Sequence, residues 1–298
     1  MKKLFFIGAL FLLSFCGSIS ANNPQDDRQL NISIFLDLSD RINPERTHSP
    51  SREPLYPQQW KRDIYAVRVI TEIFREDIRS RPLTARNQIR VLFHPIPPNS
   101  AINDIAENLR VESRRMSAVE RRNENERVFR TLTPLFINNL TKIYTQTIQT
   151  NQWIGSDIWR FFQNDVKNQS VANDDNYRNI LVILTDGYIF HRQSMYSIQN
   201  RHSYLLQRNI GRYRTLDYRE RIRNDDFGLI ATRNDLHNLE VLVLGISAEN
   251  SNHRIDENIL RFVLGNWFRE MNVARYEISN TDLPVRTETI IRNFFNVR

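Results

Sequence analysis

Two apolar runs that each lead into an aspartate constrain the fold of this chain more than any other feature. Residues 32–36 read Ile-Ser-Ile-Phe-Leu and are followed by Asp37; residues 180–184 read Ile-Leu-Val-Ile-Leu and are followed, after Thr185, by Asp186. Strands that are apolar at nearly every position are typical of parallel sheets covered on both faces. A carboxylate just past such a strand does not fill a core, so both aspartates are candidate functional groups.

The rest of the chain alternates between strands and helices. We predict strands at 32–37, 88–96, 180–185, 239–246 and 274–278, and helices at 61–79, 135–148, 158–166, 256–271 and 284–295. Thr133-Pro134 predicts the start of the second helix, because proline is favoured in a first turn. This alternation predicts an α/β fold with a doubly wound, mostly parallel central sheet flanked by helices.

A single domain over residues 31–298 is the simplest division, with insertions at about 42–59, 100–130 and 188–238. The proline-rich first insertion predicts a loop, and the charged second one predicts an exposed helix or helical hairpin. The third should form a helical insertion between the fourth and fifth core strands. Its aromatic and arginine side chains fit either a helical pair packed on the sheet or a lid that selects an acidic partner.

The N-terminus predicts export. Met1-Lys2-Lys3 and the apolar residues 4–15 are typical of a signal peptide over residues 1–20, cleaved before Ala21 and followed by a flexible lead-in at 21–30. The alternative is a lipoprotein anchored through Cys16, the only cysteine, although Phe15 departs from the small residue expected before it. Both alternatives predict a periplasmic or secreted domain. No other apolar run approaches the length of a membrane span, so we expect no transmembrane segment in the mature chain.

The positive charge of the chain comes mainly from arginine. The formal net charge is +7, and loss of Lys2 and Lys3 with the signal leaves +5. Acidic residues are interleaved throughout, which indicates a solvated surface of mixed sign. We expect no nucleic-acid binding, since no zinc-finger spacing or RNA-binding string is present.

The two aspartates suggest a cation site. In a doubly wound sheet, ligands bind outside the carboxyl ends of the strands, where the strand order reverses. If their strands are neighbours there, Asp37 and Asp186 converge, and Ser39 and Ser156 can add hydroxyl oxygens. An oxygen-only set suits Mg²⁺, Mn²⁺ or Ca²⁺. Asp40 and Asp157 are two further candidate ligands; their alternative role is a carboxylate at a helix N-terminus, which we favour for Asp40.

These motifs resemble those of the von Willebrand factor A (vWA) family. Asp37-Leu38-Ser39 after the first strand, Gly155-Ser156 before a helix and Thr185-Asp186-Gly187 after a central strand follow the order of its metal-ion-dependent adhesion site, or MIDAS. The resemblance implies a vWA/Rossmann-like fold and Mg²⁺ held by Asp37, Ser39, Ser156 and Asp186. It also implies an acidic group of a partner protein in the open coordination position. Because the oxygen-only cluster has no evident nucleophile–base pair beside it, we expect no catalytic residues.

Arg41 departs from this pattern, because the family has a second serine there. It could point into solvent, pair with Asp40, or take the place of the metal and leave a metal-free scaffold in an envelope complex. A metal-dependent phosphohydrolase is a weaker alternative. Haloacid-dehalogenase-like phosphatases need a second aspartate where Ser39 stands and a lysine near the third motif, and the nearest here is Lys167.

Overall fold

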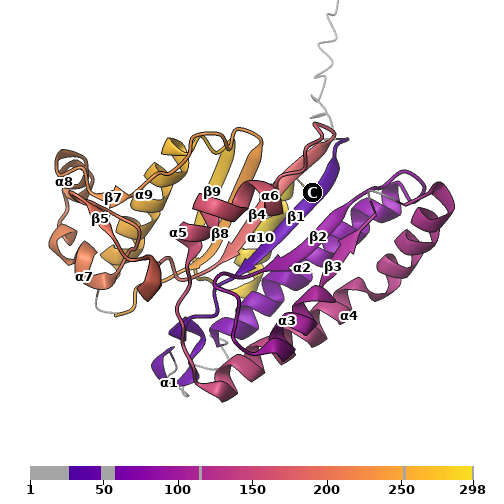
Figure 1. Ribbon diagram of the computed structural model, residues 1–298, viewed down its shortest axis with the longest axis horizontal. Coiled ribbons are helices and arrows are strands. Elements are labelled where there is room, and N and C mark those ends of the chain that lie inside the picture. The colour runs from indigo at the N-terminus through magenta and orange to yellow at the C-terminus, as the bar shows by residue number, and fades with distance from the viewer. Residues whose placement is uncertain (1–26, 48–57, 114–115, 251–252, 297–298) are drawn as a thin grey trace, which may run out of the picture.

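The computed structural model describes residues 27–47, 58–113, 116–250 and 253–296. Its centre is a six-stranded sheet in the order β3-β2-β1-β4-β8-β9, parallel except for β3 (Figure 1). The strands are β1 (Gln29–Leu36), β2 (Gln88–Leu92), β3 (Arg110–Glu112), β4 (Tyr177–Leu184), β8 (Leu239–Ile246) and β9 (Arg275–Asn280). The predicted α/β class and mostly parallel sheet are therefore confirmed, and the architecture is consistent with a Rossmann-like fold.

The order of the strands reverses between β1 and β4. From β1 the chain builds β2 and β3 on one side, then returns to the other side of β1 to build β4, β8 and β9. Leu36 and Leu184, the last residues of β1 and β4, are paired in register. Asp37 and Thr185 thus leave the sheet side by side, at the switch point where open α/β sheets bind ligands.

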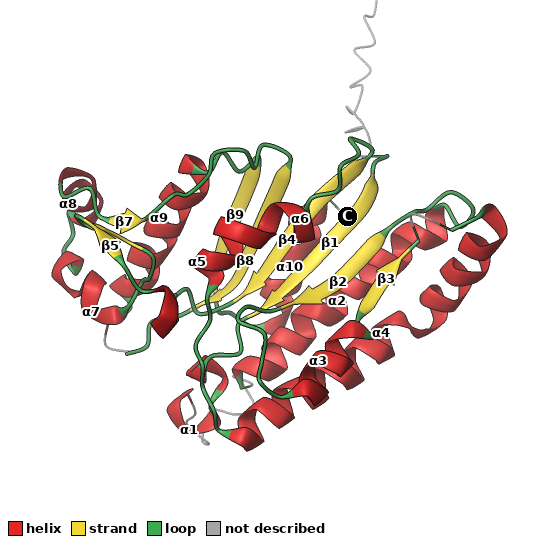
Figure 2. Ribbon diagram, in the orientation of Figure 1, coloured by secondary structure: helices red, strands yellow, loops and turns green. Residues whose placement is uncertain are grey.

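Helices cover both faces of the sheet (Figure 2). On one face, Ile34 and Val182 pack with α2 (Gln59–Ser80), α3 (Ser100–Glu107), α4 (Ala118–Thr150) and α10 (Pro284–Phe295). On the other, Phe35 and Ile183 pack with α5 (Ile158–Arg160), the π-helical turn Phe161–Asp165, α6 (Val166–Ser170) and α9 (Ile255–Glu270). Successive residues of a strand face opposite sides, so a strand apolar at both kinds of position is buried in both layers.

The predicted second insertion differs from a simple helix or hairpin. Residues 100–130 form α3, the edge strand β3 and the first part of α4, which runs for 33 residues. Helix α4 begins at Ala118 with a capping box between Ser117 and Glu120, not at Thr133-Pro134. The prediction of a helix start at Pro134 was wrong: the proline lies inside one long helix whose buried face, including Leu132 and Phe136, continues across it.

The segment between β4 and β8 is not purely helical. It contains a three-stranded sheet of β5 (Ser197–Ile198), β6 (Arg201–His202) and β7 (Gly228–Leu229), with the short helices α7 (Gln207–Ile210) and α8 (Tyr218–Asn224). It packs beside α9 at one end of the molecule (Figure 1). Of the predicted first insertion, residues 48–57 lie outside the described residues, as do the signal peptide and Cys16. The preceding residues form a 3-10 turn (Asp40–Ile42) and α1 (Pro44–Thr47).

Candidate functional site

Asp37 is buried at the end of β1 with both carboxylate oxygens engaged. Its side chain is 0 % exposed. Oδ1 accepts a hydrogen bond from the backbone N–H of Ser39 (2.9 Å), and Oδ2 accepts one from the hydroxyl of Thr185 (2.7 Å). The backbone N–H of Asp37 donates to the carbonyl of Leu184 (3.1 Å). These bonds fix the first predicted motif directly against the third.

Asp186 follows Thr185 and remains partly exposed at the carboxyl edge. Its Oδ1 accepts a hydrogen bond from the N–H of Tyr188 (3.0 Å), and no hydrogen bond from the described residues reaches Oδ2. Gly187 has φ +96°, a conformation that favours glycine, and a Cβ there would lie 2.6 Å from Cδ1 of Ile246. Glycine therefore lets the chain turn sharply after Asp186.

The structure brings Asp37 and Asp186 close enough to interact electrostatically. Burial raises the pKa of Asp186 to about 7, and the negative charge of Asp37 adds to the rise, while Arg41 and the N–H of Tyr188 oppose it. Removal of a carboxylate from water favours its protonated form, as does a second carboxylate nearby.

Ser39 and Asp40 lie at the start of the 3-10 turn after Asp37. Both are partly exposed, and Ser39 stands at the N-cap position without a side-chain capping bond. Asp40 is the acidic residue of the first turn, where the positive end of the backbone dipoles favours a carboxylate. That position agrees with the helix-terminus interpretation of Asp40.

Ser156 is held at the same edge by segments on either side. Its backbone pairs with that of Phe190, N–H to carbonyl in both directions (2.9 and 3.3 Å), and the N–H of Asp157 donates to the carbonyl of His94 beyond β2 (2.8 Å). Its hydroxyl is buried and has no hydrogen-bond partner among the described residues. No contact links Ser156 to Asp37, Ser39 or Asp186 within the described part of the chain.

Asp157 contacts helix α5 and the segment that follows β4. Its Oδ1 accepts from the N–H of Arg160 (3.0 Å), which caps helix α5 as one of the two interpretations predicts. Its Oδ2 accepts from the hydroxyl of Ser194 and lies 3.3 Å from Nδ1 of His191. Serine and aspartate both approach the same ring nitrogen of His191, at 3.3 Å each, and a catalytic triad needs them on opposite nitrogens. Asp157 therefore ties the segment after β4 to helix α5.

Arg41 is buried beneath the aspartates, so the interpretation that it points into solvent was wrong. The residue is 4 % exposed. Nε donates to the carbonyl of Asp37 (2.9 Å) and lies 3.6 Å from its Oδ2, and one Nη donates to the carbonyl of Leu184 (2.8 Å) and to Oδ2 of Asp63 (2.6 Å). The other Nη is buried and has no partner in the part of the chain that the structure describes. The guanidinium is thus anchored to the ends of β1 and β4.

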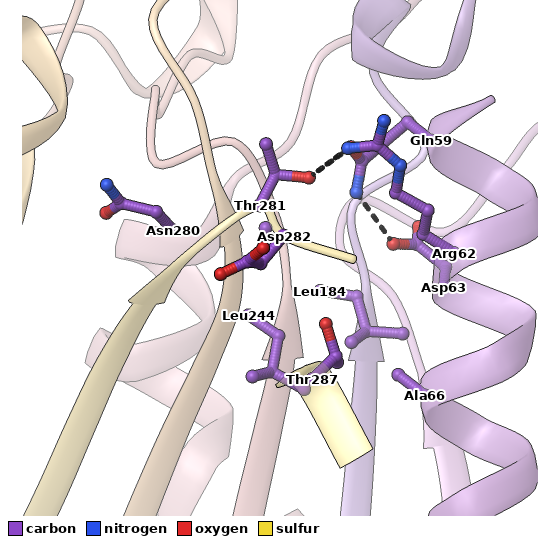
Figure 3. Close-up of a pocket in the computed structure, with 11 residues that line it drawn as sticks. Gln59, Arg62, Asp63, Ala66, Leu184, Leu244, Asn280, Thr281, Asp282 and Thr287 are labelled. Carbon is purple, nitrogen blue, oxygen red and sulfur yellow. Dashed lines mark hydrogen bonds between the residues drawn. The ribbon is translucent and has the colours of Figure 1, made fainter. Parts of the chain in front are cut away.

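Asp63 is the counter-charge of Arg41, and the sequence interpretation missed it. It projects from α2 and is 3 % exposed. Its carboxylate also accepts from the hydroxyl of Tyr144 on α4 (2.8 Å) and from the side-chain amide of Gln59 (3.2 Å). Figure 3 shows Gln59 and Asp63 extending from α2 above the end of β4. The signal was present: Asp63 lies four and seven residues before Val67 and Ile70, on the apolar face of the predicted helix.

A small hollow adjoins this network, between α2 and the ends of β4, β8 and β9 (Figure 3). Its volume is about 20 Å³. Across it, Arg62 donates to the hydroxyl of Thr281 (2.6 Å), which donates to the side-chain carbonyl of Gln59 (3.2 Å). The hollow is large enough for about one water molecule but not for an organic ligand.

The donor set at the edge suits a hard cation only if hydroxyl, backbone or water oxygens complete it. Among the described residues, no group of three or more His, Cys, Asp or Glu side chains is arranged to hold a metal ion. Two carboxylates and the unpartnered hydroxyl of Ser156 fit Mg²⁺ or Ca²⁺ better than Zn²⁺, which takes nitrogen and sulfur ligands.

No protein-family model matches the chain, and no curated protein or solved structure is significantly similar to it. In the described part of the chain, the helices are too short or too polar to cross a membrane. The site is therefore interpreted from its own residues and geometry.

Proposed function

We propose that this edge of the sheet is a MIDAS-like site, in which a divalent cation binds an acidic group of a partner protein. Asp37, Ser39, Ser156 and Asp186 would hold the cation, and Mg²⁺, Mn²⁺ or Ca²⁺ suits these oxygen donors. The cation would supply a positive charge that a carboxylate of the partner can coordinate. In this proposal the chain is an exported vWA-like binding domain, periplasmic, secreted or lipid-anchored, without catalytic residues.

The observation that carries the proposal is that Asp37 and Thr185-Asp186 leave neighbouring strands side by side at the switch point. Burial and the charge of Asp37 hold the pKa of Asp186 near 7 even though Arg41 lies close by. The hydroxyl of Ser156, buried without a partner among the described residues, is consistent with a further ligand. An unsatisfied buried hydroxyl carries a desolvation cost that a cation would relieve.

One feature favours a second candidate, a metal-free scaffold in an envelope complex. The guanidinium of Arg41 lies 3.6 Å from Oδ2 of Asp37 and already supplies one positive charge to the buried cluster. The phosphohydrolase alternative gains no such support. Lys167, the nearest lysine to the third motif in sequence, pairs with Asp235 (2.6 Å), and its helix contacts the amino-terminal end of β1 at Asn31.

Titration of Mg²⁺ and Mn²⁺ into the purified chain, followed by calorimetry, tests the proposal. We expect saturable binding by the wild-type chain and by Asp104→Asn, which changes an exposed carboxylate on α3, and none by Asp186→Asn. Capture of a partner from the native envelope should then be lost in EDTA. Absence of binding by the wild-type chain at millimolar metal would favour the scaffold.

A further inference from the structure

A buried positive charge next to Asp37 should weaken the binding of a divalent cation at the proposed site. Arg41 places a full positive charge within 3.6 Å of Oδ2 of Asp37, in a setting where little water screens it. A cation bound to Asp37 would be repelled by this guanidinium, because charges in a low-dielectric interior interact strongly. The proposed function therefore needs something that limits the effect of Arg41.

Asp63 can limit the effect of Arg41 on a bound cation, because it is negatively charged and contacts the guanidinium. It accepts a 2.6 Å hydrogen bond from Arg41 on the side of α2 and α4. Hydrogen bonds from Tyr144 and Gln59 to the same carboxylate hold it in place. The carbonyl of Asp37 accepts from Nε of Arg41, and the carbonyl of Leu184 accepts from the same Nη that bonds Asp63. Arg41 is thus held by acceptors on three segments.

The balance of charge supports the same role. The carboxylates of Asp37 and Asp63 lie within 3.6 Å of the guanidinium of Arg41, and Asp186 stands two residues after Leu184, whose carbonyl also binds that guanidinium. Ligands bind a cation in their deprotonated form, and with Asp37 and Asp186 ionised in that way the four groups carry a net charge of −2, which matches a divalent cation. Without the charge of Asp63 the same cluster would carry −1.

We propose that Asp63 is a positioning residue that holds Arg41 beneath the cation site and cancels its charge, so that a divalent cation can bind at Asp37 and Asp186. The proposal rests on the proposed function and extends the site to helix α2. Asp63 does not contact the cation; it acts through Arg41, as outer partners of metal ligands do elsewhere.

The test compares Mn²⁺ affinity, measured by calorimetry, in four full-length chains: wild type, Asp63→Asn, Arg41→Gln and the double variant. Loss of an outer partner of a metal site commonly weakens binding by about 10- to 100-fold, and we expect a loss in that range for Asp63→Asn. The double variant restores the net charge of −2 and should bind within about threefold of wild type, by the same charge argument. A purely structural role of Asp63 would not produce this rescue.

Arg41→Gln alone should bind Mn²⁺ more tightly than wild type, because it removes the repelling charge and keeps Asp63. If Asp63→Asn does not fold, judged by circular dichroism, Arg41→Gln and the double variant still test the inference, because the first should bind Mn²⁺ more tightly than wild type and the second within about threefold of it. Wild-type affinity in Asp63→Asn, no rescue in the double variant, or weaker binding by Arg41→Gln would each overturn the inference. Absence of binding by the wild-type chain would instead overturn the proposed function.

Discussion

Replacement of Asp186 by asparagine should stabilise the metal-free protein, although it removes a proposed ligand. Burial and the charge of Asp37 raise the pKa of Asp186 to about 7. Ionisation of this group above that pH therefore lowers the free energy of unfolding. Between about pH 4 and pH 7 the folded chain retains a proton that the unfolded chain has lost. Stability therefore falls as pH rises through that window and levels off above it. Asparagine never ionises, and its oxygen can still accept from the N–H of Tyr188.

The size of the effect follows from the shift in pKa. A rise from 3.8 to about 7 corresponds to at most ~4 kcal/mol, at about 1.4 kcal/mol for each pKa unit. Asp186 is partly exposed, so solvent screens the interaction and reduces this value. We expect Asp186→Asn to gain about 1–2 kcal/mol in free energy of unfolding at pH 8 in EDTA, after that discount. At pH 4.5 we expect almost no gain.

Urea unfolding of both chains in EDTA, at pH 4.5 and pH 8, measures this difference. Asp104→Asn is the matched control, because its exposed carboxylate should show no such dependence on pH. Addition of Mg²⁺ at 100 times its dissociation constant would stabilise only the wild-type chain, by about 2.7 kcal/mol, and so reverse the order of stability. A variant that is no more stable than wild type at pH 8, or that gains equally at pH 4.5, would refute the electrostatic reasoning.

Three substitutions test the packing around the site, each by urea unfolding at pH 7. Thr185→Val removes the 2.7 Å hydrogen bond to buried Asp37 and should cost about 1.5–3 kcal/mol, whereas a loss below 0.5 kcal/mol would show that water replaces the hydroxyl. Gly155→Ala should cost about 2 kcal/mol or more, because φ is +84° and the new Cβ would lie 2.2 Å from the carbonyl oxygen of Phe190. Gly211→Ala is its control: φ is not positive, the nearest atom is 3.6 Å away, and a loss as large as that of Gly155→Ala would contradict the steric argument. Phe136→Ala, at a fully buried position of α4, should cost about 3–5 kcal/mol, and a smaller loss would mean that the core collapses around the cavity.

The central sheet was predictable because parallel strands buried on both faces leave a strong local pattern. The runs at 32–36 and 180–184 became β1 and β4, and the helical periods between strands became α2, α9 and α10. Edge strand β3 was not predictable in the same way. It is three residues long and pairs with β2 on one side only, so it needs no apolar run.

At Pro134, side-chain packing overrides the usual preference of proline for the first turn of a helix. A proline after a threonine is a common helix start, yet here the helix already exists before it. The apolar face of α4 packs against α2 along its length, and that burial outweighs the hydrogen bond that proline removes. Propensity is a weak guide wherever a long buried face continues on both sides of a residue.

The candidates Asp37, Ser39 and Asp186 could be proposed from their places after predicted strands, and Ser156 from its place before a predicted helix. The surroundings of Arg41 could not be predicted in this way. Its surroundings depend on Asp63 and Tyr144, which lie 22 and 103 positions further along the chain and meet it only after α2 and α4 pack on the sheet. An arginine beside two aspartates invites the interpretation that it opposes or replaces a cation. In the proposed function, the contact with Asp63 makes the same arginine compatible with a cation, because the pair is neutral and the charge of Asp37 and Asp186 is left uncompensated.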